Sequence, residues 1–270
     1  MRLVTYRDGD TVRPGRLDVA HVVPLAGSSV KELLGNGLET VEEVGGPVAR
    51  DSVSLLAPVP DPQKIICLGL NYRHHAAETG QEPPAAPLWF AKFANSLIGD
   101  GDEIVLPAAH PEYVDYEAEL AVVIGKTARH VTADEALAHV AGAMPFNDVS
   151  ARDLQLQNPL WTSGKAVDTF APCGPAVVTL DEIDDVQALG LRTRINGELL
   201  QEGTTAEQIF GVAETVAWLS RTVTLVPGDI IATGTPAGVG AGQGRFLRDG
   251  DLVEVEVDGL GAVVNRVRAA

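Results

Sequence analysis

The stretch Asp115-Tyr116-Glu117-Ala118-Glu119-Leu120-Ala121-Val122-Val123-Ile124-Gly125 decides the fold and indicates the chemistry of this chain. Its apolar run predicts a strand over residues 116–124 whose middle is buried on both faces. Alternation along a strand places the side chains of Glu117 and Glu119 on one face, about 7 Å apart. Two carboxylates beside a core repel each other and are costly to desolvate, and a cation between them removes that cost. The alternative is a strand at a sheet edge with both glutamates in water.

A second acidic segment follows the apolar residues 141–146, so Asp148 emerges where a strand ends. With Glu117 and Glu119 it would give an all-oxygen donor set, which Mg²⁺ or Mn²⁺ prefers, whereas Ca²⁺ usually takes more ligands. Three protein ligands leave about three positions of an octahedron for water or substrate, as Lewis-acid catalysis requires. These three side chains are therefore candidate ligands of a divalent cation.

Two histidines and a glutamate follow the apolar residues 65–68 at helical spacing. His75 and Glu78 are three residues apart, and His74 and Glu78 are four apart, so either pair can meet on a helix face. A carboxylate that holds one imidazole nitrogen leaves the other nitrogen as a general base. Spacing alone does not choose between the histidines. The alternative is a surface helix with a charge-stabilised histidine.

The composition is that of an acidic protein with an ordinary apolar content. The chain has 270 residues, 45% hydrophobic and 21% charged, and a formal net charge of −17. This balance argues against nucleic acid and against an anionic membrane surface as partners. No apolar run approaches the about 18 residues of a membrane helix, and the N-terminus lacks the apolar stretch of a signal peptide. Cys67 and Cys173 are too few for a disulfide framework, so we expect a reduced, cytoplasmic protein.

The predicted elements indicate a mixed α/β protein that is mainly β, without the regular alternation of a doubly wound fold. Three prolines within residues 57–62 suit an extended connector, so we expect a small N-terminal domain over residues 1–60 and a second domain over residues 61–270. Asn196-Gly197 predicts a hairpin. The expected helices cover residues 29–34, 133–140 and 204–220, and the expected strands cover residues 3–6, 19–25, 64–68, 88–92, 116–124, 192–195, 198–201, 229–232, 252–257 and 262–267.

Local motifs mark where two of these helices begin. Ser29 is available as the N-cap of the first helix. Thr204 and Glu207 have the spacing of a capping box, which predicts that the last helix begins there.

Five segments with characteristic residues occur in order between residue 63 and the C-terminus. They are residues 69–72 with His75 and Glu78, 115–120, 147–155, 164–165 with 168–170, and 227–229 through 234–236. Together they resemble the fumarylacetoacetate hydrolase (FAH) superfamily, and the first sixty residues resemble the small extra domain of many bacterial members. The resemblance implies an FAH-type β-roll of curled mixed sheets with few helices, usually assembled as a homodimer.

The resemblance also implies roles for individual residues. It assigns the ligands of a divalent ion, usually Mg²⁺, to Glu117, Glu119 and Asp148. It places the catalytic pair on His75 and Glu78, with His74 incidental. The further matches are Lys165 as a catalytic residue, with Arg152, Gln155, Thr235 and Tyr72 as substrate contacts.

Members of the family act on 2-oxo acids, often 2,4-dioxo acids, and the main prediction is a metal-dependent hydrolase of this substrate class. It would cleave a C–C bond of an acylpyruvate or a fumarylpyruvate-like acid to give pyruvate and a carboxylic acid. His75, oriented by Glu78, would activate the water, and Lys165 would stabilise the oxyanion. Decarboxylases of oxaloacetate-like acids and isomerases or tautomerases of hydroxymuconate-type acids use the same chemistry. A non-catalytic metal-binding β protein is the alternative of another class.

Overall fold

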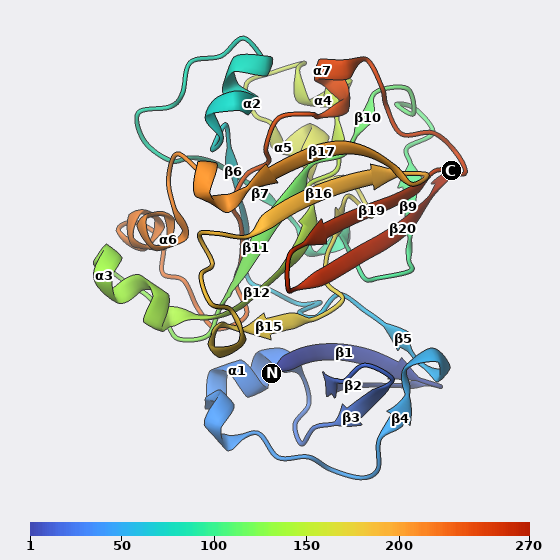
Figure 1. Ribbon diagram of the computed structural model, residues 1–270, viewed down its shortest axis with the longest axis vertical. Helices are drawn as coiled ribbons and strands as arrows, with labels where there is room; N and C mark the ends of the chain where they lie inside the picture. The colour runs from blue at the N-terminus through green and yellow to red at the C-terminus, as the bar shows by residue number, and fades with distance from the viewer.

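A computed structural model describes residues 1–270, and a large mixed sheet forms most of its framework (Figure 1). The expected class, a mixed α/β fold that is mainly β, is confirmed. The large sheet has 11 strands in the order β4-β3-β2-β1-β15-β12-β11-β18-β6-β7, with β5 beside β1. Its strands are β1 Arg2–Asp8, β2 Thr11–Leu17, β3 His21–Pro24, β4 Val48–Ala49, β5 Ser54–Leu55, β6 Ile65–Gly69, β7 Leu88–Lys92, β11 Ala118–Ile124, β12 Val140–Asn147, β15 Val177–Thr179 and β18 Ile230–Ala232.

A second sheet of five strands, in the order β17-β16-β19-β20-β9, lies against β11 and β12. The predicted hairpin at Asn196-Gly197 is confirmed: Ile195 pairs with Glu198, and both turn residues have positive φ. The five strands are β9 Glu103–Leu106, β16 Gly190–Ile195, β17 Glu198–Thr204, β19 Leu252–Val257 and β20 Gly261–Ala269. Two short ladders pair β10 Val114–Asp115 with β13 Ser150–Ala151, and β8 Leu97–Ile98 with β14 Ala171–Pro172.

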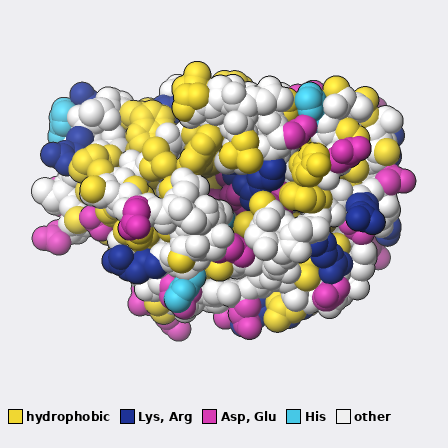
Figure 2. Space-filling model, turned by 90° about the horizontal axis from the view of Figure 1, so that it is seen from above, with side chains coloured by type: hydrophobic (Ala, Val, Ile, Leu, Met, Phe, Trp, Pro, Cys, Tyr) yellow, Lys and Arg dark blue, Asp and Glu magenta, His cyan; other side chains and the backbone are white.

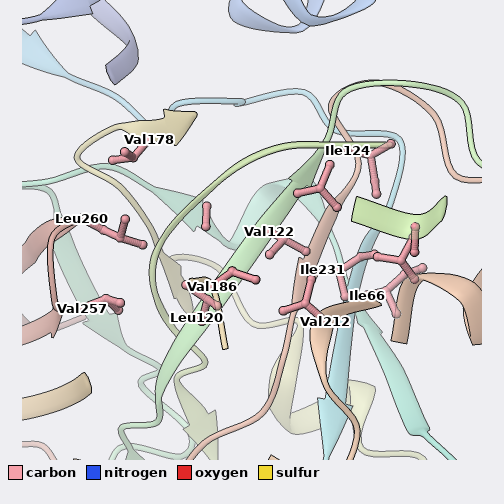
Figure 3. Packing of buried hydrophobic residues seen from close by; sticks show 14 of the residues in the cluster. Ile66, Leu120, Val122, Ile124, Val178, Val186, Val212, Ile231, Val257 and Leu260 are labelled. Atoms are coloured by element: carbon pink, nitrogen blue, oxygen red, sulfur yellow. The ribbon is translucent and has the colours of Figure 1, made fainter. Parts of the chain in front are cut away.

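Strand β11 lies in the middle of the core and is buried on both faces, as its sequence predicts. Leu120 and Val122 pack with residues of the second sheet, including Val257, in one hydrophobic cluster (Figure 3). Ala121 and Val123 point to the other face, into a separate cluster. Because side chains alternate, Glu119 shares this second face. The strand therefore places an acidic side chain next to an apolar core. Burial of each leucine or valine side chain of the strand stabilises the fold by about 1.5–3 kcal/mol.

The helices are short and lie in the connections between strands. Ser29 caps the first of them as predicted, since its hydroxyl accepts from the Glu32 amide at 3.1 Å. The α-helices are α1 Val30–Asn36, α2 Arg73–Glu78, α3 Ala133–Ala136, α4 Arg152–Gln155, α5 Thr162–Lys165, α6 Val212–Ser220 and α7 Gly240–Gln243. The 3-10 turns are η1 Leu38–Thr40, η2 Arg50–Ser52, η3 Ala94–Ser96, η4 Leu137–His139, η5 Leu180–Glu182 and η6 Thr205–Glu207.

Two predicted helices are shorter than their sequence patterns indicate. The helix expected over 133–140 ends at Ala136 and continues as η4, because Val140 already pairs with Ile124 in the large sheet. The helix expected from Thr204 begins only at Val212. Residues 198–204 are held as strand β17 by β16, and Asn71 then binds the backbone of residues 209 and 210. Tertiary pairing thus overrides the local capping pattern.

The N-terminal strands are joined to the rest of the protein through the large sheet. β1 pairs antiparallel with β15, with Leu3 opposite Val177. In Figure 1 the elements from β1 to β5 form the lower part of the molecule. A domain boundary at residue 60 stays a prediction. No helix of the chain has the length and apolar character needed to cross a bilayer.

Candidate active site

The three acidic side chains predicted as metal ligands lie together where β11 and β12 meet. Glu119 is on β11, Glu117 immediately precedes that strand, and Asp148 follows β12. The Asp148 amide donates to the Glu117 carbonyl at 2.9 Å, which fixes the two segments side by side. All three side chains are buried, and a possible ligand atom from each lies within 4.8 Å of those of the other two.

Two buried lysines balance part of this negative charge. Lys165, predicted as a catalytic residue, lies at the end of α5 and donates to Glu117 Oε2 at 2.9 Å and to Asp148 Oδ2 at 2.8 Å. Lys92, at the end of β7, donates to Asp148 Oδ1 at 2.6 Å and to the Val149 carbonyl at 3.0 Å. The sequence analysis does not assign Lys92 to the site. Its only indication is a charge that ends the apolar run of residues 88–92.

Burial and neighbouring charges shift the pKa values of Glu117 and Glu119 in opposite directions. Burial alone would raise the pKa of Glu117, but the positive charges of Lys165 and Arg152 outweigh it and lower that pKa to about 2. Burial, together with the carboxylates of Asp148 and Glu117, raises the pKa of Glu119 well above its usual value. Glu119 is therefore the acid whose charge the protein compensates least.

Glu119 also shows that the donor set fits a divalent cation. Its Oε2 accepts from the Gly234 amide at 2.9 Å, but its buried Oε1 has no hydrogen-bond partner. A buried polar atom without a partner costs about 1–3 kcal/mol, more when it is charged, and coordination to a hard cation would satisfy it. Together with those of Glu117 and Asp148, the atoms that could coordinate the ion are carboxylate oxygens, the type that Mg²⁺ and Mn²⁺ bind.

His75 and Glu78 form the predicted pair on α2. His75 Nδ1 lies 3.4 Å from Glu78 Oε2, so its Nε2 is the nitrogen left for proton transfer. Glu78 also accepts from the Gly238 amide at 3.0 and 3.1 Å. Burial raises the pKa of Glu78, but the hydrogen bonds from His75 and Gly238 lower it overall. His74 is exposed on the same helix, so the geometry favours His75 where spacing leaves the choice open.

Arg152, at the start of α4, contacts three acceptors. Its Nη1 lies 2.6 Å from Glu117 Oε1 and donates to Gln155 Oε1 at 3.0 Å. Its Nε donates to Asp115 Oδ2 at 2.8 Å. Asp115 is fully buried and also accepts from the amides of residues 240 and 241, at 2.7 and 2.9 Å. No sequence pattern gives Asp115 a role, and in the structure it is the residue that orients the arginine.

Thr235 and Tyr72, both predicted as substrate contacts, lie in different environments. Thr235 follows β18 and lines the site cavity, where its hydroxyl accepts from Gln201 Nε2 at 2.9 Å. Gln201 is buried in β17, and no sequence pattern singles it out. Tyr72 is buried at the start of α2, its hydroxyl accepts from Gln208 at 3.3 Å, and it does not line the cavity.

The site opens into a cavity of about 490 Å³, a volume typical of small-molecule sites. Figure 2 looks onto this end of the molecule, where basic and acidic side chains lie in a hollow bordered by hydrophobic ones. The predicted site residues that line it are His75, Glu78, Glu117, Arg152, Gln155, Lys165 and Thr235, whereas Glu119 and Asp148 are buried behind the lining.

A buried carboxylate cluster beside a His–Glu pair, in a cavity of this size, is typical of a metal-dependent enzyme. Residues 64–268 match the family model described as Fumarylacetoacetate (FAA) hydrolase C-terminal, and the chain belongs to this family. The resemblance inferred from the sequence is therefore confirmed. Enzymes of this family act on small organic acids.

The relatives of the chain are named for different activities. The chain is 40% identical to human "Oxaloacetate tautomerase FAHD2A, mitochondrial", covering 99% of this chain and 91% of the relative. It is 34% identical to the solved 2-hydroxyhepta-2,4-diene-1,7-dioate isomerase of Mycobacterium marinum, with a TM-score of 0.86 over 100% and 98% of the two chains. It is 35% identical to the solved fumarylacetoacetate hydrolase of Exiguobacterium antarcticum, with a TM-score of 0.88 over 100% of both chains. The human relative shows that the resemblance extends beyond bacterial members.

Proposed function

We propose that this protein is a keto–enol tautomerase of oxaloacetate-like 2-oxo acids. The observation that carries the proposal is the similarity to an oxaloacetate tautomerase along 99% of the chain. The similarity to an isomerase of known structure supports it. A tautomerase must stabilise an enolate and move one proton, and the cavity holds residues suited to both tasks. This departs from the hydrolase that the sequence analysis places first and follows its isomerase or tautomerase alternative.

In the proposed reaction the acidic cluster would serve enolate stabilisation, and the His–Glu pair would serve proton transfer. Glu117, Glu119 and Asp148 would hold Mg²⁺ or Mn²⁺, and such an ion supplies Lewis-acid stabilisation of enolate charge. In the enol-to-keto direction the enol oxygen gives its proton to water and C3 gains one, so no net proton is consumed. His75 would deliver the proton to C3 through Nε2 and remove it in the reverse direction. Glu78 would keep the imidazole oriented throughout.

The cationic and polar side chains would bind and orient the substrate. The hydrogen bond from Arg152 to Asp115 orients the guanidinium before the carboxylate of a substrate binds. Thr235 would contact a charged end of the substrate. Lys165, with Gln155 beside it, would stabilise negative charge on the substrate's oxygen atoms.

Hydrolysis of a 2,4-dioxo acid is the second candidate, and one observation favours it. The fumarylacetoacetate hydrolase with a TM-score of 0.88 shares this fold at full length. A His–Glu pair can activate water as well as move a proton to carbon. The two reactions differ in their products, because only hydrolysis breaks the C3–C4 bond.

Product analysis tests the proposal. The purified protein with Mg²⁺ or Mn²⁺ is given the enol of oxaloacetate, and separately a 2,4-dioxo acid such as acetylpyruvate. We expect the enol absorbance of oxaloacetate to fall faster than without enzyme, with no more pyruvate released than the metal ion alone produces. Pyruvate plus acetate from acetylpyruvate, without accelerated tautomerisation of oxaloacetate, would establish the hydrolase instead. Pyruvate and carbon dioxide from oxaloacetate would establish a decarboxylase.

Three further expectations stay proposals. We propose a homodimer, and equilibrium sedimentation would measure it directly. We propose Mg²⁺ as the usual ion, with Mn²⁺ as a substitute. A cytoplasmic location also stays a proposal, and the mitochondrial location printed for the human relative belongs to that protein.

A further inference from the structure

The cavity has an apolar side that the proposed reaction on oxaloacetate does not use. Phe90 and Trp161 meet there edge to face, with ring centroids 5.7 Å apart. Leu70, Leu156 and Val239 also line the cavity. Leu156 is 78% exposed although it lines a cavity, so its side chain is available to a ligand. A four-carbon acid fills only part of about 490 Å³ and would leave this side in contact with water.

The position of the Trp161 ring is set by a glycine on the neighbouring strand. A Cβ atom at Gly69 would lie 2.2 Å from Cζ3 of Trp161, so the ring occupies the space that any other residue would fill. Phe90 in turn has the Lys165 ammonium 5.1 Å from its ring centroid. Phe90 therefore lies directly beside the ammonium group of Lys165, and Trp161 packs against Phe90.

The cavity is lined by two basic side chains, and neither is free to bind a further charged group. Its lysine and arginine are Lys165 and Arg152, and both are bound to buried carboxylates. No further lysine or arginine lines the cavity beside the aromatic pair, so a second, distant carboxylate would find no partner there. Burying such a charge without a partner is strongly unfavourable. The substrate group that this side fits is uncharged and apolar.

We propose that the enzyme also tautomerises 2-oxo acids that carry an aromatic group on C3, the arylpyruvates, and that Phe90 and Trp161 bind the aryl ring. This inference rests on the proposed function, because the 2-oxo acid end is bound by the same residues in both substrates. The enol oxygen loses a proton and C3 gains one, so the reaction needs no further reactant. Aromatic rings favour the edge-to-face and offset contacts that this pair offers.

The first test compares substrates on the unmodified enzyme with Mg²⁺. The enols of phenylpyruvate, 4-carboxyphenylpyruvate and oxaloacetate are followed by loss of their ultraviolet absorbance, after subtraction of the uncatalysed rate. We expect kcat/KM for phenylpyruvate within about tenfold of the value for oxaloacetate, and at least about tenfold above that for the carboxylated analogue. Turnover of oxaloacetate alone would overturn this inference and leave the proposed function standing. Turnover of phenylpyruvate alone would support the inference and refute oxaloacetate as substrate, and turnover of neither would overturn both.

Variants of the aromatic pair provide the second test. Trp161→Ala is expected to lower the ratio of kcat/KM for phenylpyruvate over oxaloacetate by about tenfold, since it removes one aromatic contact. Trp161→Phe keeps an aromatic ring and should hold the ratio within about threefold. Trp218→Leu on α6, outside the cavity, is the matched control and should leave the ratio unchanged.

Direct binding covers the case in which Trp161→Ala is poorly folded. 3-Phenyllactate cannot tautomerise, and calorimetric titration should show that the unmodified enzyme binds it more tightly than malate. An unchanged substrate ratio in folded Trp161→Ala, or tighter binding of malate than of 3-phenyllactate, would overturn the assignment.

Discussion

Replacing Asp115 by asparagine should both destabilise the protein and make the side chain of Arg152 less rigid. The Asp115 carboxylate is fully buried and accepts four hydrogen bonds: from Arg152 Nε, from its neighbour's amide, and from the amides of residues 240 and 241. Asparagine removes the charge and directs an NH₂ group at one set of these donors. Breaking one partner of a buried ion pair costs about 3–5 kcal/mol. Because Arg152 keeps Glu117 at 2.6 Å, we expect the lower end, about 3 kcal/mol.

Thermal unfolding and steady-state kinetics measure the two effects of Asp115→Asn. A loss of about 3 kcal/mol should lower Tm by about 6–12 °C in a domain of this size. A less rigid Arg152 should raise KM for oxaloacetate by about tenfold, which corresponds to about 1.4 kcal/mol. Asp18→Asn, in an exposed ion pair with Arg16, is the control and should cost less than about 1 kcal/mol. A Tm within 2 °C of the unmodified protein, roughly what 1 kcal/mol would produce, would refute the reasoning.

Three further predictions concern the metal, the base and the backbone of the site. Treatment with EDTA should abolish activity, and Mg²⁺ or Mn²⁺ should restore it; full activity in EDTA would contradict the metal site. Glu117→Gln should weaken Mn²⁺ binding by at least about tenfold in calorimetric titration, while the far-ultraviolet circular dichroism spectrum is retained. His75→Ala should lower kcat at least about 100-fold and leave Mn²⁺ affinity within about threefold, and an unchanged kcat would mean that another group moves the proton. Gly240→Ala should lower stability by at least about 2 kcal/mol in urea denaturation, because its Cβ would lie 2.0 Å from the Arg245 carbonyl oxygen; an unchanged midpoint would show that the loop can shift.

Strand alternation makes the acidic residues candidates for a cluster, and the resemblance to the family assigns all three as metal ligands. Alternation across residues 116–124 predicts Glu117 and Glu119 on one face, and the apolar run before Asp148 predicts that it follows a strand. Helical spacing allows either His74 or His75 to meet Glu78, and the family resemblance assigns the pair to His75, which the structure places beside Glu78. Each position follows from the pattern of one element, whereas the meeting of Asp148 with Glu117 depends on the pairing of β11 with β12.

The parts of the site that sequence analysis misses depend on contacts between distant elements. Lys92 reaches Asp148 from β7, 56 residues away, and Gln201 reaches Thr235 from the second sheet. Neither residue belongs to a local pattern that differs from an ordinary strand. The same limitation explains the helix expected from Thr204, since the strand pairing that displaces it involves β16. Predicting these features requires knowing which strands are neighbours.

The loop at residues 238–241 is fastened at both ends by acidic side chains of the site. Glu78 holds the amide of Gly238, and Asp115 holds the amides of residues 240 and 241. His75, through Glu78, and Arg152, through Asp115, therefore both depend on the position of this loop. Efforts to broaden the substrate range by directed evolution should vary Phe90 and Trp161 and leave this loop intact. Any displacement of the loop would change the positions of both His75 and Arg152.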